Sequence, residues 1–268
     1  MMKVQDVNRI WLNLLREVLT NGVDVAPRDM KTKEILGCYT IDASRTVLTV
    51  PERKINYRFM AAEPLWILAG RDDVASIAQY NSQMANYAPL GDRFFGAYGP
   101  RWQAQWVYLI SKLIEDRDTR QAVVSLWTEN PPKGVDVACN ILLVFSIRGR
   151  QVNLTVSARS KDLWLGFPYD VFGFSMALHK VVCALNGVKV YDPPLLPGII
   201  TFFDSSLHLY EQHWEAAREL LRYDEHPEPP FPRASIPASP ATRGDWLFYE
   251  TYLKDMRDVR GGGPLFEE

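Results

Sequence analysis

The chain contains few cysteines, no long hydrophobic run and no large excess of either charge. Its three cysteines are Cys38, Cys139 and Cys183, and no CxxC pair occurs among the 268 residues. An odd count without such a pair argues against a disulfide framework or a metal site and favours a reducing cytoplasm. No stretch approaches the roughly 20 apolar residues that cross a bilayer, and the N-terminus lacks the apolar core of a signal peptide. We therefore expect a cytoplasmic protein with no metal and no membrane partner.

The charges nearly balance, with 30 Lys and Arg against 32 Asp and Glu and a net charge of −2. Nucleic-acid polymers are usually bound through a basic excess, so none is expected as a partner. A mononucleotide needs only a few arginines and is not excluded. The hydrophobic fraction of 47% is enough to bury a sizeable core, and no linker interrupts the chain. One domain over residues 1–268 is predicted.

Hydrophobic periodicity predicts a mixture of helices and strands. Helical spacing is found in 5–21, 55–80, 103–116, 171–186 and 206–222. Strand patterns are found in 36–50 (as strand, turn, strand), 122–127, 139–147, 151–158 and 198–203. Residues 84–102 are predicted to form a packed loop, and the proline-rich stretch 226–240 an extended surface loop. The elements do not alternate strictly as β-α-β, so an α+β fold is favoured over a doubly wound one.

Six short motifs carry the polar residues of chemical interest. In chain order they are RDMKT (28–32), AAEPLWILAG (61–70), FGAYGPRW (95–102), DTRQ (118–121), RSKDLWLGFPYD (159–170) and HLY (208–210). Together they resemble the thymidylate synthase and deoxycytidylate hydroxymethylase family, with the cytidylate 5-hydroxymethylase branch nearest. Any one motif alone is weak, but six in one order are specific. The resemblance implies a large twisted mixed β-sheet packed with helices, with one sheet face at a homodimer interface.

The resemblance also implies a catalytic group built around a thiol. Cys139 is the expected nucleophile that adds to C6 of a pyrimidine and so activates C5, and Arg159 is expected to lower its pKa. Glu63 is expected to organise the water that removes the C5 proton, and Tyr98 to assist proton transfer. Asp170 completes the catalytic set. Without the family context, Cys139 is a small buried hydrophobe and Tyr98 is a core residue.

Further residues are implied for binding. For the nucleotide they are Arg28, Arg159, Ser160 and the partner subunit's Arg120 at the phosphate, His208 and Tyr210 at the sugar, and Asn140, Asp162 and Asp170 at the base. For the donor, 5,10-methylenetetrahydrofolate, they are Glu63, Asp162, Gly166, Tyr169 and Tyr87. Members of the family usually carry a second arginine after the one at position 120; Gln121 stands there in this chain. One phosphate contact is therefore expected to be lost or replaced.

Asp170 stands where members acting on uracil have an asparagine. Uracil presents an N3–H donor and an O4 acceptor, which suit an amide, whereas cytosine presents the reverse pair. A carboxylic acid can donate to N3 and accept from N4, and an ionised one can pair with N3-protonated cytosine. Asp170 therefore predicts a cytidylate, dCMP or CMP, and the alternative is a solvated aspartate in a turn.

Two further departures point the same way. Asn140 replaces a histidine that usually follows the nucleophile. Met84 and Tyr87 occupy the region where tryptophans that shield the reacting carbon are expected, so that water could add there. The predicted function is a cytidylate 5-hydroxymethyltransferase, with deoxyribose favoured by Ser160.

Three rivals stay open: a cytidylate 5-methyltransferase, a thymidylate synthase with an unusual aspartate, and an inactive homologue that binds nucleotide or RNA. The C-terminal sequence RGGGPLFEE departs from the closing tail of the family. How such a chain would seal its site over folate does not follow from the sequence.

Overall fold

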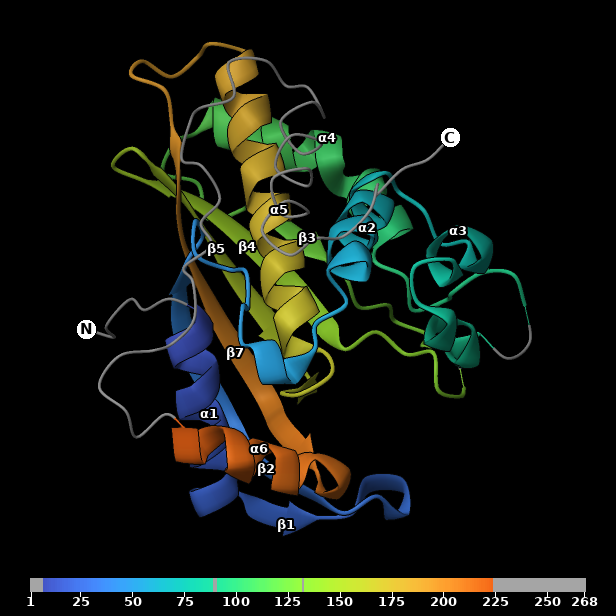
Figure 1. Cartoon of the computed structure of the whole chain (residues 1–268). Coiled ribbons are helices and arrows are strands. Elements are labelled where there is room, and N and C mark those ends of the chain that lie inside the picture. The colour runs from blue at the N-terminus through green and yellow to red at the C-terminus, as the bar shows by residue number, and fades with distance from the viewer. Residues whose placement is uncertain (1–6, 89–90, 132, 224–268) are drawn as a thin grey trace.

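The computed structural model describes residues 7–88, 91–131 and 133–223 (Figure 1). The proline-rich stretch 226–240 and the C-terminal RGGGPLFEE lie outside the described residues. Within the described part of the chain, no helix has the length and apolar character needed to cross a membrane.

A mixed sheet forms the centre of the molecule. Its strands are β1 (Val23–Val25), β2 (Thr32–Asp42), β3 (Val123–Ser125), β4 (Asn140–Arg148), β5 (Gln151–Ala158), β6 (Lys161–Asp162) and β7 (Leu196–Tyr210). The order is β1-β2-β7-β5-β4-β3, with β6 paired to β7. The pairs β5–β7 and β6–β7 are parallel and the others antiparallel. The predicted α+β class is confirmed.

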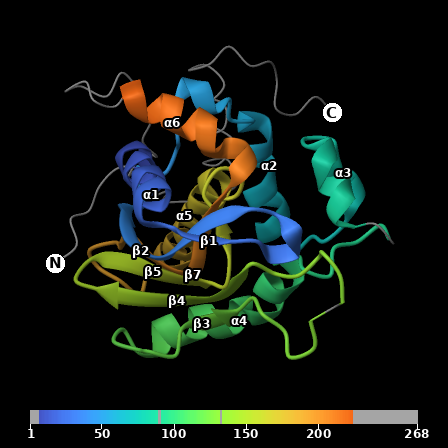
Figure 2. The same cartoon turned by 90° about the horizontal axis from the view of Figure 1, so that it is seen from below.

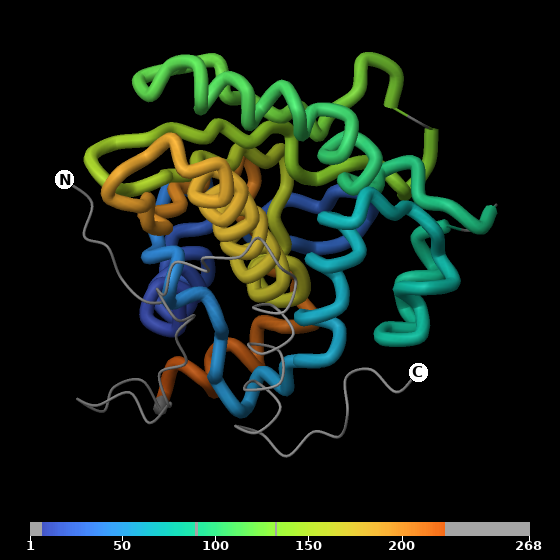
Figure 3. The backbone as a smooth tube through the Cα atoms, turned by 90° about the horizontal axis from the view of Figure 1, so that it is seen from above, coloured from blue at the N-terminus to red at the C-terminus, as the bar shows by residue number. Residues whose placement is uncertain are grey.

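Helices pack around this sheet and on one another. They are α1 (Val7–Asn21), α2 (Tyr57–Leu68), α3 (Val74–Ala78), α4 (Gly99–Glu115), α5 (Phe167–Gly187) and α6 (Trp214–Tyr223). Short 3-10 turns lie at η1 (Pro27–Asp29), η2 (Pro51–Arg53), η3 (Ser82–Tyr87) and η4 (Glu211–His213). Figure 2 shows α1, α5 and α6 on the same side of the strands. In Figure 3 the tubes of α2, α4 and α5 lie next to one another, and these three helices contact each other.

The side chains of strand β7 alternate between the two faces of the sheet. Phe202 is fully buried under the helices and stacks on Tyr39 with ring centroids 5.0 Å apart. Its neighbour Phe203 points the other way and is 48% exposed, and Leu36 of β2 is 80% exposed. The alternation follows from the two-residue period of a strand. The face opposite the helices therefore carries apolar side chains that nothing in the described residues covers.

Three sequence predictions were wrong in detail. The predicted second strand within 36–50 is absent: β2 ends at Asp42, whose carboxylate accepts the amide of Ser44 at 2.8 Å in a turn. The predicted helix 206–222 begins only at Trp214, because pairing with β2 and β6 keeps residues up to Tyr210 extended. The predicted helix 55–80 is divided into α2 and α3 after Gly70, whose φ of +77° favours glycine.

Candidate active site

Cys139 and Arg159 meet because β4 and β5 pair. The Arg159 amide donates to the Cys139 carbonyl at 2.9 Å, which continues the hairpin ladder by one step. The guanidinium donates to the carbonyls of Ala138 at 2.9 Å and Val137 at 3.0 Å, and its Nη2 lies 3.8 Å from the Cys139 sulfur. The Cys139 residue itself is exposed. The predicted nucleophile is therefore accessible and lies beside the predicted cation.

The electrostatic balance at the thiol is less simple than expected. Desolvation raises the pKa of Cys139 above its usual value, and the charge of Asp170 adds to the rise, while Arg159, Lys161 and Arg28 counteract it. Arg159 thus acts in the predicted direction, but it does not outweigh desolvation. The protonated thiol is the favoured form in the free protein.

Asn140, Tyr98 and Asp170 form a hydrogen-bonded group next to the thiol. Asn140 is fully buried, and both its backbone amide and its Nδ2 donate to the Tyr98 hydroxyl, at 3.1 and 2.9 Å. Nδ2 also lies 3.5 Å from each Asp170 oxygen. Burial, with the charges of Asp170 and Cys139, raises the pKa of Tyr98, so its phenol stays protonated. Three residues predicted separately therefore share one network.

The sequence reasoning missed Lys161. Its side chain is 0% exposed, and its ammonium forms an ion pair with Asp170 and donates to Oδ1 of Asn140 at 2.9 Å. The rings of Phe174 and Phe202 lie 5.6 and 5.8 Å from the ammonium. Burial alone lowers the pKa of Lys161, but the charges of Asp170 and Asp204 raise it above its usual value. The available signal was a lysine inside the family-specific segment RSKDLWLGFPYD, which also contains Asp170.

Beneath Lys161 lies a second buried carboxyl. Asp204 is fully buried and accepts the Tyr39 hydroxyl at 2.8 Å through Oδ2, while Oδ1 has no partner among the described residues. Desolvation raises its pKa, while Lys161 and Tyr39 oppose the rise. Lys161 therefore lies between Asp170, whose carboxylate faces the site, and Asp204, whose carboxyl group lies in the core.

Glu63 of α2 faces the same region. With Tyr98, Tyr169 and Asp170 it lines a cavity of about 30 Å³ whose other walls are mainly aliphatic and aromatic. Such a volume holds a water molecule. Burial first, and the charge of Asp170 second, raise the pKa of Glu63 to about 8, against the effect of Lys161. The prediction that Glu63 is not a surface glutamate is confirmed.

The raised pKa of Glu63 predicts a pH-dependent stability. The folded protein holds this proton up to about pH 8, whereas the unfolded chain releases it near 4.5. The stabilising contribution is complete below pH 4.5 and is lost as the pH rises through 8. Relative to Glu63→Gln, the unfolding free energy of the wild type should fall by about 1 kcal/mol per pH unit between pH 5 and 8. Urea titrations of both proteins across this pH range measure the difference in unfolding free energy. A difference that stays constant with pH would contradict the prediction.

The predicted phosphate and sugar residues line another side of Cys139. Arg28 lies in η1 with a φ of 53° and is close enough to Cys139 and Tyr210 to lower the pKa of both groups. Ser160 follows Arg159 at the end of β5. The ring of His208 packs edge-on against Tyr210 with centroids 5.1 Å apart, and its buried Nε2 finds no partner in the part of the chain that the structure describes. An unpaired ring nitrogen there suits a sugar hydroxyl.

The residues predicted for folate have mixed surroundings. Tyr169 packs edge-on against Phe59 at 5.1 Å, and Gly166 precedes α5. Oδ1 of Asp162 accepts the amides of Trp164 and Leu165, both at 2.8 Å, so this carboxylate also shapes its own turn.

Two further observations concern the folate side. Tyr87 is 51% exposed at the end of η3 and does not line the Glu63 cavity. Arg53, missed by the sequence reasoning, lies over the Trp164 ring at 5.3 Å. This combination of aromatic rings, a carboxylate and one cation suits a ligand that has a flat ring rich in hydrogen-bond donors and an acidic tail.

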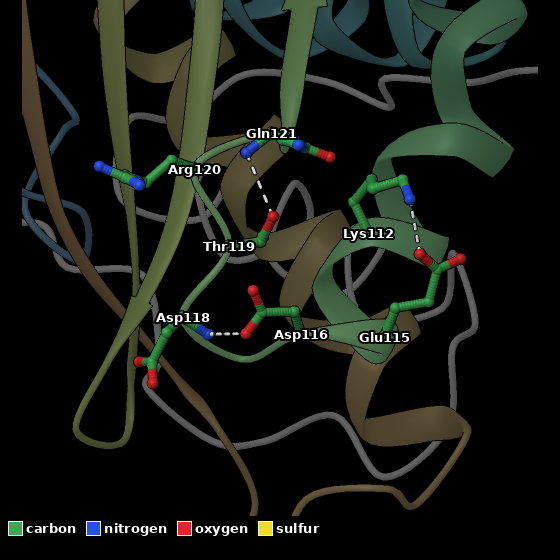
Figure 4. Close-up of a pocket in the computed structure, with 7 residues that line it drawn as sticks. All are labelled: Lys112, Glu115, Asp116, Asp118, Thr119, Arg120 and Gln121. Atoms are coloured by element: carbon green, nitrogen blue, oxygen red, sulfur yellow. Dashed lines mark hydrogen bonds and ion pairs between the residues drawn. The ribbon is translucent and has the colours of Figure 1, made fainter.

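Arg120 lies apart from the other predicted residues. It lines a pocket of about 260 Å³ at the end of α4, together with Lys112, Glu115 and Asp116. Figure 4 shows its side chain pointing away from Lys112 and Glu115. Within this chain Arg120 is not among the groups that influence Cys139.

The comparisons with known proteins agree with this arrangement. The family model described as Thymidylate synthase matches residues 9–256. A deoxyuridylate hydroxymethyltransferase of Pseudomonas phage M6 is 35% identical over 177 residues, which cover 62% of this chain and 48% of the relative. A deoxyuridylate hydroxymethyltransferase of Bacillus phage SP01 is 32% identical over 226 residues, which cover 75% and 56%. The chain spans about half the length of these relatives. Because the family model covers most of its length, the chain belongs to the thymidylate synthase family.

Proposed function

We propose that this protein is a folate-dependent transferase that places a hydroxymethyl group on C5 of a pyrimidine nucleoside monophosphate. The observation that carries the proposal is the accessible Cys139 thiol beside Arg159, on the same side of the sheet as the Asn140, Tyr98 and Asp170 network. Family membership supports a one-carbon transferase, and both relatives are named hydroxymethyltransferases.

Each group has a role that its surroundings support. Arg28 and Arg159 bind the phosphate, because guanidinium groups match phosphate oxygens bidentately. A dianionic phosphate on Arg28 and Arg159 leaves less positive charge for the sulfur, so Lys161 helps to keep the thiolate available. His208 Nε2 and the Tyr210 hydroxyl bind the sugar. Cys139 then adds to C6 of the ring, and electron density reaches C5.

Proton removal from C5 is assigned to the Glu63 cavity. A glutamate with a pKa of about 8 is a competent base near neutral pH and a competent acid just below it. A water in the cavity would connect Glu63 with the Tyr98 hydroxyl and Asp170, which line the same space. The role of Tyr98 is to hold Asn140 and relay a proton.

Methylenetetrahydrofolate supplies the one-carbon unit at the oxidation level of formaldehyde. Tyr169, Gly166 and Asp162 would hold its ring, and Arg53 its acidic tail. Tyr87 and Met84 offer less cover than the indoles expected there, which supports hydration of the transferred carbon over hydride transfer. A rival that transfers hydride gives a methyl group and dihydrofolate.

Two rings are candidates, each with one observation in its favour. Cytosine, as dCMP or CMP, is favoured by Asp170 in place of the amide of uracil-specific members, and Ser160 favours the deoxyribose form. Uracil, as dUMP, is favoured by the two relatives, which are named deoxyuridylate hydroxymethyltransferases.

A homodimer is part of the proposal. Leu36 and Phe203 are 80% and 48% exposed on the sheet face that no described helix covers, and a second copy would bury them. Arg120 lies outside its own chain's site, which supports its donation across that interface to the partner's phosphate. The single catalytic domain over 1–268 and the cytoplasmic location stay predictions.

The proposal predicts a definite product. Incubation with methylenetetrahydrofolate and each of CMP, dCMP, UMP and dUMP should give one nucleotide heavier by the mass of CH2O, with no rise in dihydrofolate absorbance. A product heavier by CH2 with dihydrofolate formed would support the methyltransferase. Nucleotide or RNA binding without any product would support the inactive homologue.

A further inference from the structure

We propose that Lys161 is a specificity-determining residue: it keeps Asp170 a charged acceptor and fixes the Asn140 amide, so the site selects uracil over cytosine. The inference rests on the proposed function and chooses between its two rings. It reverses the ring that Asp170 alone predicts.

The first step concerns the charge of Asp170. The Lys161 ammonium contacts Oδ2 of Asp170 from a position with no exposed surface. An adjacent cation favours the ionised form of a carboxyl group, and an ionised carboxylate only accepts hydrogen bonds. The remaining Asp170 oxygen, on a side chain that is 24% exposed, therefore offers the ring an acceptor and no donor.

The second step concerns the orientation of Asn140. An ammonium has three donors and no acceptor, so the 2.9 Å contact from Lys161 requires the oxygen of the Asn140 amide. The Nδ2 group is thereby turned towards Tyr98 and Asp170. A flipped amide would set a donor against the ammonium. Lys161 thus fixes the acceptor at Asp170 and, behind it, the orientation of the buried Asn140 amide.

The third step compares the two rings at that wall. Uracil offers Asp170 an N3–H, which the carboxylate accepts. With Asp170 opposite N3, cytosine instead brings a lone pair against that carboxylate. Cytosine then binds only with an extra proton on N3 or on Asp170. Leaving buried polar groups unsatisfied weakens binding by at least about tenfold.

Other titratable groups face this pair. They are Cys139, Glu63, Tyr98, Asp204 and Tyr39. The pKa values of Cys139, Glu63 and Tyr98 are raised, so at pH 6.5 these three already hold their protons. Any proton taken up at the phosphate or at the sugar-binding residues is common to dCMP and dUMP, so a difference between the two nucleotides arises at the ring and the polar groups beside it.

The test replaces Lys161 by methionine, which suits a site between Phe174 and Phe202. Wild type should favour dUMP over dCMP in kcat/KM. Lys161→Met should move that ratio towards dCMP by at least about tenfold, because Asp170 loses the adjacent cation that favours the ionised, accept-only form of a carboxyl group. Its dCMP turnover should also fall as the pH rises. An unchanged ratio would overturn the role of Lys161.

Two further variants separate specificity from folding. Lys161→Met with Asp170→Asn removes both charges of the ion pair and should restore the preference for dUMP. The matched control is Lys180→Met, which removes a half-buried ammonium of α5 that donates to Leu68 O at 2.7 Å, and its ratio should stay that of wild type. A double variant that favours dCMP overturns the inference.

Wild-type binding gives an independent readout. Calorimetry at pH 6.5 in buffers of different ionisation enthalpy measures the protons taken up on binding. The binding of dCMP should take up one proton more than the binding of dUMP, which carries the same phosphate. Tighter binding of dCMP without that proton overturns the role of Lys161 and leaves the transferase standing. A protein that binds neither nucleotide overturns both.

Discussion

Replacing Cys139 by serine is expected to lower kcat by at least about 10⁴-fold, because the reaction depends on a covalent bond to C6 that a hydroxyl forms poorly. Nucleotide binding should persist, since Arg28, Arg159 and His208 do not depend on the sulfur for their positions. The Arg159 guanidinium is held by the carbonyls of Ala138 and Val137. Steady-state rates and calorimetry on one preparation separate the two effects.

The matched control is Cys38→Ser. Cys38 is exposed on β2 of the single chain, but it lies on the sheet face away from the site, beside Phe203 where the proposed dimer would cover it. Its replacement should leave kcat within about twofold of wild type. Equal losses at both cysteines would show that Cys139 is not the nucleophile. An acid-quenched wild-type sample should also gain the mass of one nucleotide, and Cys139→Ser should not.

Recovery of activity from two inactive variants is expected if Arg120 acts across the interface. Arg120→Ala removes a phosphate contact and should lower kcat/KM on the order of 10²-fold. When the Arg120→Ala protein is unfolded and refolded with an equal amount of the Cys139→Ser protein, half of the dimers contain one chain of each variant. Each mixed dimer contains one site with both groups intact, so about a quarter of native activity should return. Rates against the mixing ratio measure this recovery.

The control mixture pairs Cys139→Ser with Glu63→Gln. Both residues belong to the same chain's site, so every site in a mixed dimer carries one defect and no recovery is expected. If the Arg120→Ala mixture also stays inactive, Arg120 acts within its own chain or not at all. A monomer in sedimentation would contradict the dimer in the same experiment.

Local patterns predicted much of the fold. The hairpin of 139–147 and 151–158, the helix 5–21 and the helix 171–186 agree with β4, β5, α1 and α5 within a few residues. Each of these segments has a clear hydrophobic periodicity or is bounded by residues typical of a turn. The failures lie where distant pairing decides: β7 runs to Tyr210 because β2 and β6 lie beside it.

The candidate site was likewise predicted only in part from the sequence. Cys139, Arg159, Asn140 and Tyr98 were predicted from motifs, and they lie together because the motifs mark the ends of adjacent elements. Lys161 was missed, since the residue types around it in the chain do not show that its side chain turns inward. Asp162 was predicted only as a binding residue, and its role in capping a turn was not.

The sequence by itself determined the family and the fold class and predicted the candidate reactive groups other than Lys161, because those follow from a set of motifs in a fixed order. Only the tertiary structure decided their charge states. A carboxyl or an amine titrates according to what surrounds it, and strands and helices far apart in the chain supply those surroundings. The burial of Glu63 and the contact between Lys161 and Asp170 are of this kind, and the choice of substrate ring depends on the second of them.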